Sequence, residues 1–585
     1  MRVHTSLAAT GLALTTAILL ASCGAAPTTQ AGAASSTAAP APGSGQGDTL
    51  HLLWLQAPTI LNPHLATGTK DFDASRVTYE PLASFDQDGS LVPFLAAEIP
   101  SRENGGLAAD GKSVTWKLKA GVKWSDGEPF TAEDVKFTYD FLADKATAAT
   151  TTSTYSAVSG VEVIDPTTVK VRFRDVSPAW SLPFVGTAGL IIPKHIFQGY
   201  VGAKAREAPA NLKPVGTGPY RVVDFKPGDI VVYEPNPYFR EQGKPFFARV
   251  ELKGGGDPTS AARAVLQTGE VDFTPGLSAA PQVLEQLKAG GKGLVVPASL
   301  GGFSERIELN YTDPNAEVDG ERSSLKAPHP FFSDSKVRQA FALAVDRTTI
   351  AAQVYGPSAT PITNAVVEPP TVVSPNTKAE YNLQKAAALL DEAGWKDTNG
   401  DGVREKNGVA LSILYQTSIV PARQKTQEVI KQALESIGFK VELKSVDNGI
   451  FFGSDPNNTD NFNHFYADVQ VYTIGNNNPD PGAYLESFTC AKIAQKANSW
   501  SGSNRVRYCN PHYDELFQKS TVELDPAKRQ QLFIQLNDLL ISDVAIIPLV
   551  KNASNLGVSS SLEGTSFTPW DSTLWQIKDW RRKAS

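Results

Sequence analysis

The stretch Gly121-Val122-Lys123-Trp124-Ser125-Asp126-Gly127-Glu128-Pro129-Phe130-Thr131-Ala132-Glu133-Asp134-Val135 joins a strand pattern to a helix pattern. Before it, Ser113 to Leu118 alternates between polar and apolar side chains, as a half-buried strand does. Near its end, Thr131 and Asp134 have the spacing of a capping box, in which two side chains satisfy free amides at the start of a helix. We therefore expect a helix that begins beside Thr131 and runs on through Val135–Tyr139.

Strand and helix patterns alternate through the rest of the chain. Strands are expected at Leu50–Leu55 and in a hairpin that turns at Asp165-Pro166. Each of the other expected helices has a capping residue at one end: 260–268 ends at Gly269, 337–345 starts after Ser333 or Asp334, 383–390 leads to Gly394, and 429–437 leads to Gly438. This alternation predicts an α/β fold.

Length and composition limit the possible functions. The chain has 585 residues, which is too many for one hydrophobic core and enough for two or three lobes. It is 41% hydrophobic and 20% charged, with a net charge of −7. Because no block of basic residues is present, we expect no nucleic acid partner.

The first residues have the pattern of a targeting segment. Arg2 precedes a largely apolar stretch, Leu7–Leu20, that is too short to span a bilayer comfortably. Leu20-Ala21-Ser22-Cys23-Gly24 resembles the bacterial lipobox, in which the signal peptide is removed and the cysteine carries a diacylglycerol. We expect a signal peptide at 1–22, lipidation of Cys23 and anchoring on the extracytoplasmic side of a membrane, in the periplasm or on the cell surface. The alternative is a plain secretory signal with an incidental cysteine.

The targeting pattern also bears on the segment 23–48, which would follow the signal peptide, and on the two other cysteines. Residues 25–48 are almost all Ala, Pro, Thr, Ser, Gly and Gln, which indicates a flexible tether. Outside the cytoplasm, the two remaining cysteines, Cys490 and Cys509, are expected to form a disulfide. The alternative is a metal site with His512, but a second pair of ligands is missing from the sequence nearby.

The usual catalytic and cofactor motifs are missing from the sequence. It has no HExxH, no G-x-S-x-G and no P-loop lysine, and Gly216-Thr217-Gly218-Pro219 lacks the third glycine of a dinucleotide-binding turn. We therefore expect no enzyme, no metal and no cofactor. One motif has two interpretations: Asp397–Gly402 matches the first half of a calcium loop, but Gly408 stands where a bidentate Glu is needed. A turn rich in Asx and Gly is favoured, and a calcium site with Glu405 as substitute ligand is the other interpretation.

Several segments together resemble one family. The stretch from Gly121 to Val135 looks like a signature of the bacterial peptide- and nickel-binding proteins, the family 5 extracytoplasmic solute-binding proteins of ABC importers. Further matching segments follow in the expected order over about residues 50–550: Gly216-Thr217-Gly218-Pro219-Tyr220, Asn236-Pro237-Tyr238-Phe239, Gly269-Glu270-Val271-Asp272, Pro330-Phe331 with Asp334, Val337-Arg338-Gln339-Ala340, Ala344-Val345-Asp346-Arg347, Leu389-Leu390 to Ala393-Gly394-Trp395, and Asp480-Pro481.

The resemblance implies a large two-lobed α/β fold of the periplasmic-binding-protein type (type II, cluster C), with an extra subdomain and a discontinuous first lobe. The expected ranges are lobe I at 49–310 with the inserted subdomain at about 95–215, lobe II at 311–547, and a return to lobe I at 548–585. Crossovers between the lobes are expected near Asn310 and near Pro548. Closure of the lobes around a ligand would create the form that membrane permeases recognise.

The same resemblance implies a function and a binding loop. We expect a monomeric, lipid-anchored binding component of an ABC importer that captures a peptide-like ligand and delivers it to permease subunits. A sensor or chaperone of the same fold, or a secreted hydrolase, are the alternatives. The family's cleft-lining loop implies that the ligand contacts come from six residues: Tyr472, Asn476, Asn477, Asn478, Asp480 and Tyr484.

Two departures from the family pattern bear on the ligand. Members that bind short peptides often carry an acid just before the Asp-Pro motif, where this chain has asparagines. An arginine expected just before Pro421 is replaced by Thr417 and Ser418, and Arg423 is expected on a helix surface. These departures disfavour a dipeptide and leave a longer peptide, a sugar-derived ligand or another amphipathic metabolite.

Overall fold

The computed structural model describes residues 48–584 except 300, 357, 454, 456 and 552. The predicted signal peptide, the lipidation site Cys23 and nearly all of the predicted tether therefore lie outside the described residues. All described residues belong to one structural unit. The first strand, β1 (Thr49–Trp54), coincides with the predicted buried strand, and its Leu50, Leu52 and Trp54 are buried.

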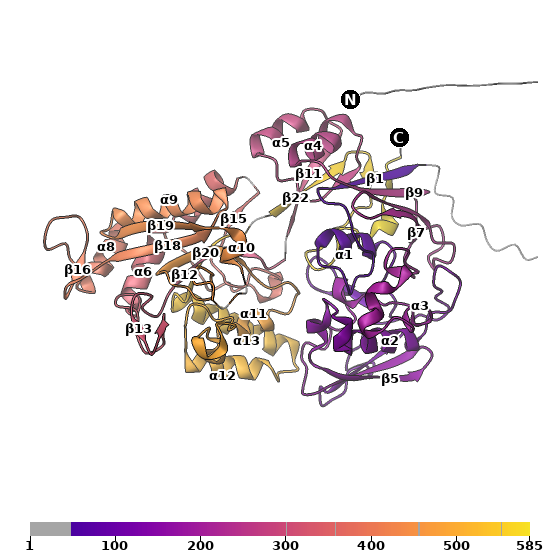
Figure 1. Ribbon diagram of the computed structural model, residues 1–585, viewed down its shortest axis with the longest axis horizontal. Coiled ribbons are helices and arrows are strands. Elements are labelled where there is room, and N and C mark those ends of the chain that lie inside the picture. Colours follow the sequence, from indigo (N-terminus) through magenta and orange to yellow (C-terminus); the bar gives the residue numbers. More distant parts are fainter. Residues whose placement is uncertain are drawn as a thin grey trace, which may run out of the picture. The chain divides into compact units, whose positions relative to one another are not determined.

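Lobe I is built on a seven-stranded sheet in the order β11-β22-β10-β1-β9-β8-β7. β1 pairs in parallel with both β9 and β10, which places segments about 200 residues apart side by side. The strands are β7 (Tyr220–Lys226), β8 (Ile230–Pro235), β9 (Arg249–Gly254), β10 (Phe273–Thr274), β11 (Gly293–Ser299) and β22 (Ala553–Ser559). The helices that accompany the sheet are α1 (Thr69–Arg76), α4 (Pro258–Arg263) and α5 (Pro281–Lys288), and Figure 1 shows the last two beside β11.

The inserted subdomain, called the insert below, has its own three-stranded sheet in the order β4-β6-β5. Its elements are β4 (Ser113–Lys117), α2 (Ala132–Ala143), β5 (Val158–Asp165), β6 (Thr168–Phe173) and α3 (Lys194–Phe197). The predicted capping box is present at the start of α2: Thr131 N donates to Asp134 Oδ2 at 2.9 Å, and Glu133 N donates to Thr131 Oγ1 at 3.3 Å. The hairpin β5–β6 turns at Asp165-Pro166 as predicted.

Two motifs that carry the family resemblance pack against each other. Ser125 N, in the stretch 121–127, donates to Gly216 O at 2.9 Å. A Cβ atom at Gly216 would lie only 2.0 Å from the carbonyl oxygen of Thr78, so this position requires glycine. This contact joins the insert to lobe I, and the close approach to Thr78 explains the glycine at position 216 without any contact to a ligand.

Lobe II is built on a six-stranded sheet in the order β15-β21-β12-β20-β18-β19. Its strands are β12 (Ser304–Leu309), β15 (Thr360–Pro361), β18 (Ser412–Ser418), β19 (Lys440–Val446), β20 (Val469–Ile474) and β21 (Ile546–Lys551). Its helices are α6 (Ser335–Leu343), α7 (Arg347–Ile350), α8 (Leu383–Glu392), α9 (Pro421–Glu435), α10 (Asn448–Phe451), α11 (Gly482–Glu486), α12 (Pro511–Ser520) and α13 (Pro526–Ser542). Asp334 caps α6, as one of the two predicted alternatives.

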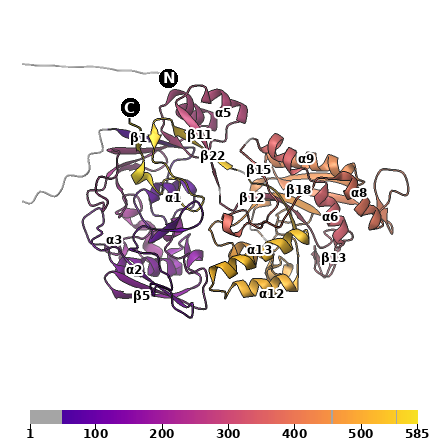
Figure 2. The ribbon, with the colours of Figure 1, turned by 180° about the vertical axis from the view of Figure 1, so that it is seen from behind.

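The chain crosses between the two sheets twice. β11 of lobe I ends at Ser299 and β12 of lobe II begins at Ser304, whereas the sequence indicated a crossover near Asn310. β21 of lobe II ends at Lys551 and β22 of lobe I begins at Ala553, slightly after the expected position at Pro548. Because β22 inserts between β11 and β10, lobe I is assembled from discontinuous segments, and Figure 2 shows β22 beside β11.

Short strands complete the two lobes. Lobe I also contains the hairpin β2 (Ala83–Phe85) and β3 (Leu91–Pro93), and the pair β23 (Leu562–Glu563) and β24 (Arg581–Arg582) near the C-terminus. Lobe II also contains the hairpins β13 (Glu317–Val318) with β14 (Glu321–Arg322) and β16 (Glu405–Lys406) with β17 (Val409–Ala410). The tip of the β2–β3 hairpin, at Gly89, lies close to Pro369 and Pro479 of lobe II.

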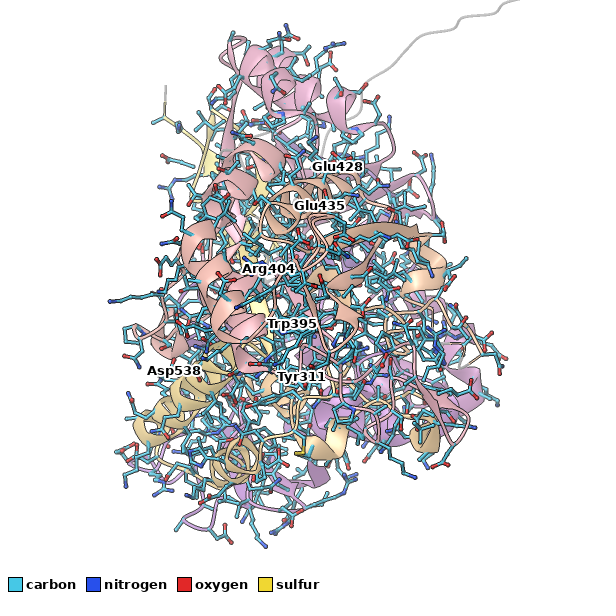
Figure 3. The ribbon with its side chains drawn as sticks, turned by 90° about the vertical axis from the view of Figure 1, so that its left-hand side faces the viewer. Tyr311, Trp395, Arg404, Glu428, Glu435 and Asp538 are labelled. Carbon is cyan, nitrogen blue, oxygen red and sulfur yellow. A yellow bond between two sulfur atoms is a disulfide. The ribbon has the colours of Figure 1, made fainter. Side chains whose placement is uncertain are left out.

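The candidate calcium loop lies beside the β16–β17 hairpin of lobe II. Arg404 donates to Asp391, to the carbonyl oxygen of Trp395 and to that of Ile437 at 2.6–2.9 Å, and Figure 3 shows it next to Trp395. Asp397 accepts backbone amide hydrogens from Gly400 at 2.7 Å and from Gly402 at 2.9 Å. The oxygens of Asp397 are therefore used within the turn, and the described part of the chain contains no group of three or more metal-ligating side chains.

The predicted disulfide between Cys490 and Cys509 is confirmed. It joins the segment after α11 to the segment just before α12 and closes a loop of 19 positions. Within the described ranges, no helix is both long and apolar enough to cross a bilayer.

Candidate functional site

The predicted binding loop follows β20, at an edge where three strand ends meet. β18 runs parallel to β19 and to β20, so Ser418, Val446 and Ile474 end at the same edge of the lobe II sheet. Loops at the carboxyl ends of parallel strands are the usual place for ligand contacts in α/β folds. The loop Asn476–Pro481 starts from this edge and lines two cavities, one with Asn477 and the other with Pro479, Asp480 and Pro481.

Two of the predicted contact residues belong to the core of lobe II. Tyr472 donates to Glu308 Oε1 at 2.6 Å, and Arg306 donates to the hydroxyl oxygen of Tyr484 at 2.7 Å. Both tyrosines are buried, and burial raises the pKa of each hydroxyl. They line neither cavity, so their role in the fold is to surround the buried Arg306–Glu308 ion pair.

The three asparagines have different surroundings. Asn476 is buried, and its Nδ2 donates to Glu368 O at 2.9 Å and to Asn478 O at 3.0 Å. Asn478 accepts the amide hydrogen of Asp480 at 3.0 Å and so shapes the turn. Asn477 is exposed and lines the larger of the two cavities. Asn477 is thus the residue of the loop that is placed to contact a ligand there.

Asp480, the acid of the Asp-Pro motif, is paired within the protein. Its Oδ1 accepts the amide hydrogen of Gly482 at 2.8 Å, and its carboxylate forms an ion pair with Arg529 of α13. Both side chains are about 15% exposed, and Arg529 also donates to Ser520 O at 2.9 Å. Asp480 is therefore already neutralised, which leaves it poorly suited to receive a ligand ammonium group.

The prediction for Arg423 was wrong. Its side chain points inward from α9 and is only 11% exposed. It donates to Glu305 at 3.1 Å, to Ser418 Oγ at 2.7 Å and to Thr473 Oγ1 at 2.8 Å. These hydrogen bonds engage the guanidinium of Arg423. It therefore joins β12, β18 and β20 and is not a free anchor for a ligand carboxylate.

The larger cavity, called the crossover cavity, has a volume of about 720 Å³ and lies where the chain crosses between the lobes. Ser299 and Ser554 of the crossovers line it, and Asn477 is its contribution from lobe II. Four aromatic residues of lobe I form much of its wall: Trp54, Phe72, Phe567 and Trp570. The volume and the aromatic lining are typical of sites that enclose a small organic ligand.

Two acidic side chains lie in the wall of the crossover cavity. Asp571 forms an ion pair with Arg76 at 3.2 Å, and Asp73 accepts hydrogen bonds from Trp54 Nε1 at 3.0 Å and Ser572 Oγ at 2.5 Å. Burial raises the pKa of Asp73 to about 6, although both hydrogen bonds oppose the shift. Asp73 fixes the orientation of the Trp54 ring, which is a positioning role.

Some polar groups of this cavity have no partner. Trp570 Nε1 and Thr573 Oγ1 are buried without a hydrogen bond within the described part of the protein. An unsatisfied buried donor costs about 1–3 kcal/mol, so such groups usually meet a water or a ligand. Both atoms are closed off from solvent, so they lie behind the surface of the cavity, whose exposed polar groups include the side chains of Ser299, Ser554 and Asn477.

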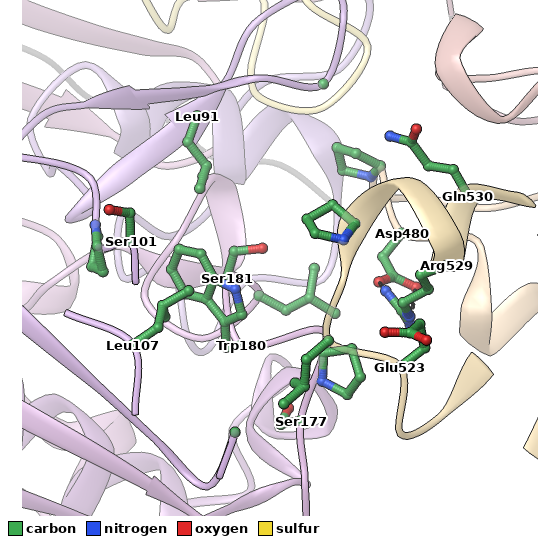
Figure 4. A pocket seen from close by; sticks show the side chains of 18 of the residues that line it. Leu91, Ser101, Leu107, Ser177, Trp180, Ser181, Asp480, Glu523, Arg529 and Gln530 are labelled. Atoms are coloured by element: carbon green, nitrogen blue, oxygen red, sulfur yellow. Dashed lines mark hydrogen bonds and ion pairs between the residues drawn. The ribbon is translucent and has the colours of Figure 1, made fainter. Parts of the chain in front are cut away.

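The smaller cavity, called the insert cavity, has a volume of about 480 Å³ and lies on the other side of the loop. Pro479, Asp480 and Pro481 line it from lobe II, together with α13 and the segment before it. The β2–β3 hairpin and the insert line it from lobe I. Figure 4 shows Leu107 and Trp180 on one side and Asp480 and Arg529 on the other.

The residues of lobe I that line the crossover cavity are not predictable from clear local patterns. Trp54 lies in a strand that reads as buried core, and Asp73 lies in a helix with an ordinary polar pattern. The one local signal is Phe567-Thr568-Pro569-Trp570-Asp571-Ser572-Thr573, where aromatic residues alternate with hydroxyl and acidic groups outside any regular element. Such a stretch near the C-terminus could have been proposed as a lining segment.

Comparison with known proteins agrees with this architecture. Residues 90–495 match the family model of the bacterial extracellular solute-binding proteins, family 5. Oligopeptide-binding protein AppA of Bacillus subtilis is 28% identical over 551 residues, covering 92% of each chain. The nickel-binding periplasmic protein of Escherichia coli is 28% identical over 411 residues, covering 68% of this chain and 71% of the relative.

A solved structure shows the same fold. The AppA structure from Bacillus subtilis in complex with a nonapeptide aligns with a TM-score of 0.64 at 24% identity, and covers 92% of this chain and 99% of that one. The two-lobed α/β architecture predicted from the sequence is thereby confirmed. The chain belongs to the bacterial extracellular solute-binding proteins of family 5.

Proposed function

We propose that this protein is the lipid-anchored binding component of an ABC importer and that it holds a peptide-like ligand in the crossover cavity. The position of that cavity at both crossovers, with Asn477 as its contact from lobe II, is the observation that carries the proposal. A ligand in this place contacts both lobes, so binding stabilises the closed arrangement over the open one.

The charges around the crossover cavity favour a ligand that is rich in neutral polar groups. Lys70 is paired with Asp71 at 2.6 Å, and Asp571 is paired with Arg76. Ser299, Ser554 and Asn477 line the cavity with neutral polar side chains, and a peptide backbone supplies hydrogen-bonding partners for such groups at regular intervals. Aromatic walls accept side chains of varied shape.

Names of the relatives support a peptide as the first ligand to test. AppA is named as an oligopeptide-binding protein, and another relative, GsiB of Shigella boydii, is named as a glutathione-binding protein. Glutathione is itself a peptide-like compound. The proposed ligand is therefore a peptide longer than a dipeptide, because the charged anchors expected for a dipeptide are engaged within the protein at Asp480 and Arg423.

Delivery to permeases follows from the proposed closure. Two lobes that approach each other around a ligand create a composite surface that the open form lacks, and a permease can recognise that surface. The lipid on Cys23 would keep the protein near its permease, while the polar segment 25–48 gives it reach.

Mass spectrometry of the ligand that co-purifies with the protein tests the binding proposal. Peptides with intact ends are the expected result, and they should rebind to the emptied protein in calorimetry. A protein that returns peptide libraries cleaved would instead be a hydrolase. A protein that neither co-purifies with peptides nor binds any from a library would contradict the proposed ligand class.

The anchor is tested separately with Cys23→Ala. We expect this variant in the soluble secreted fraction, or unprocessed, while the wild type incorporates labelled lipid and stays with the membrane. A variant that still carries the lipid label would show that Cys23 is not the anchor.

A further inference from the structure

We propose that the insert cavity is a second binding site, which takes an uncharged apolar group such as an aromatic ring or a branched aliphatic chain. The proposal goes beyond the capture of a peptide in the crossover cavity and stands independently of it. It rests on three properties of the cavity. Apolar side chains line both walls, most charged lining residues are paired or exposed to solvent, and contacts between the lobes enclose the space.

The two walls of the insert cavity are apolar and come from different lobes. Leu91, Leu107 and Trp180 face it from lobe I, and Trp180 packs against Trp116 with 6.0 Å between ring centroids. Val372, Leu524 and Phe533 face it from lobe II. Figure 4 shows Leu91, Leu107 and Trp180 together on the lobe I side of the cavity. Water makes few hydrogen bonds to apolar walls. An apolar group that displaces this water would therefore bind favourably.

The charged residues that line the insert cavity do not favour a charged ligand. Asp480 and Arg529 neutralise each other in the lobe II wall. Asp88, Arg102 and Glu103 also line the cavity but are exposed to solvent, and the half-buried Glu523 accepts the amide hydrogen of Asp525 at 2.7 Å. An anionic ligand would find Arg529 already paired, and the apolar walls would remove hydration from any charged group, so an uncharged group is favoured.

The cavity exists because the lobes touch at two places that line it. A Cβ atom at Gly89, at the tip of the β2–β3 hairpin, would lie 3.1 Å from Pro479 and 3.2 Å from Pro369. A Cβ atom at Gly111 of the insert would lie 2.7 Å from Leu524. Both glycines have positive φ angles, +81° and +66°. An occupant of the insert cavity therefore contacts both lobes and favours their approach, as a ligand in the crossover cavity does.

The two cavities share no lining residue, and the loop Asn476–Pro481 separates them. The apolar group has two possible sources. It is either a separate small molecule or an apolar side chain of a peptide whose backbone lies in the crossover cavity. The chemistry of the site is the same in both cases, and the experiment below distinguishes them.

The test uses N-phenyl-1-naphthylamine, an uncharged probe whose fluorescence rises in apolar surroundings. We expect saturable binding to the wild-type protein. Ser181→Trp fills the cavity from lobe I and Gln530→Trp fills it from lobe II, and each should weaken probe binding at least about tenfold. The matched control is Gln535→Trp, on the same helix as Gln530 but exposed and outside the cavity. Circular dichroism and thermal unfolding confirm that each variant is folded.

Displacement then identifies the source of the apolar group. Peptides that contain Phe or Leu should displace the probe if a peptide side chain fills the cavity, and Asn477→Ala should weaken that displacement. Displacement by none of the peptides would assign the cavity to a separate small molecule. The proposal fails if both filled variants bind the probe as well as the Gln535→Trp control. That result would leave the co-purification test of the proposed function unaffected.

Discussion

Asp480 and Arg529 form an ion pair that joins the Asp-Pro turn to helix α13, with 3.2 Å between Arg529 Nη2 and Asp480 Oδ1. This pair changes the meaning of the Asp-Pro motif in this chain. The carboxylate that would be the nearest partner for a ligand amine instead holds the loop Asn476–Pro481 in place.

We therefore expect Asp480→Ala to act mainly on stability. Removal of the carboxylate leaves Arg529 partly buried without its partner, which should lower the free energy of unfolding by about 1–3 kcal/mol. Lys528→Ala removes an exposed cation from the same helix and serves as the control. Urea unfolding measures stability, and calorimetry with the co-purified ligand should show affinity within about threefold of wild type. A large loss of affinity at unchanged stability would instead place Asp480 in contact with the ligand.

Asn477→Ala should weaken ligand binding and leave the stability of the fold nearly unchanged. Its side chain is exposed and lines the crossover cavity, so the fold does not depend on it, whereas a ligand group that it meets would be left unpaired. The expected loss of ligand affinity is about 1–3 kcal/mol, with little change in the free energy of unfolding. Asn399→Ala, in an exposed turn at the β16–β17 hairpin, is the matched control. Equal affinities for the two variants would exclude Asn477 from the site.

The buried Asp73 predicts a specific dependence of stability on pH. Burial raises its pKa from 3.8 to about 6, so the folded protein binds this proton more tightly than the unfolded chain does. Its contribution to stability is therefore greatest below about pH 4 and is lost as pH rises to about 6. The difference in free energy of unfolding between wild type and Asp73→Asn should fall over this window by about 1–3 kcal/mol.

The comparison with Asp73→Asn is needed because the contribution of His64 to stability changes with pH in the opposite direction. Burial lowers the pKa of His64 from 6.5 to about 4, so its contribution to stability is lost as pH falls through that range. The pH profile of the wild type alone would combine the two. A difference between wild type and Asp73→Asn that stays level from pH 4 to pH 7 would show that Asp73 is ionised as easily in the folded protein as in the unfolded chain.

Loss of the disulfide should destabilise the protein. Replacement of both Cys490 and Cys509 by serine frees a loop of 19 positions in the unfolded chain, which costs about 3 kcal/mol in the chain-entropy model. Urea unfolding of the double variant, compared with wild type before and after reduction, measures this effect. Reduced wild type and the double variant should coincide, and an effect of reduction on the double variant would point to another cause.

Local features of the fold were predictable from the sequence because each depends on a few neighbouring residues. The capping box at Thr131 and Asp134 defines the start of α2 through two hydrogen bonds within four positions. The turn at Asp165-Pro166 and the buried strand at Thr49–Trp54 follow from similarly short patterns. Cys490 and Cys509 were a predictable pair because elimination left one partner for each. The position of the loop after β20 came from the family resemblance, which the match to the family model supports.

The tertiary structure alone decided which of those loop residues face a cavity and what faces them. Alternation of side chains along β20 and the turn after it cannot show that Tyr472 lies over the Arg306–Glu308 pair or that Arg529 approaches Asp480 from 49 positions away. The lining by Trp54, Asp73 and Trp570 depends on parallel pairing between distant strands and on the return of the chain through β22. Contacts of this kind arise when separate segments pack together, so local sequence spacing does not encode them.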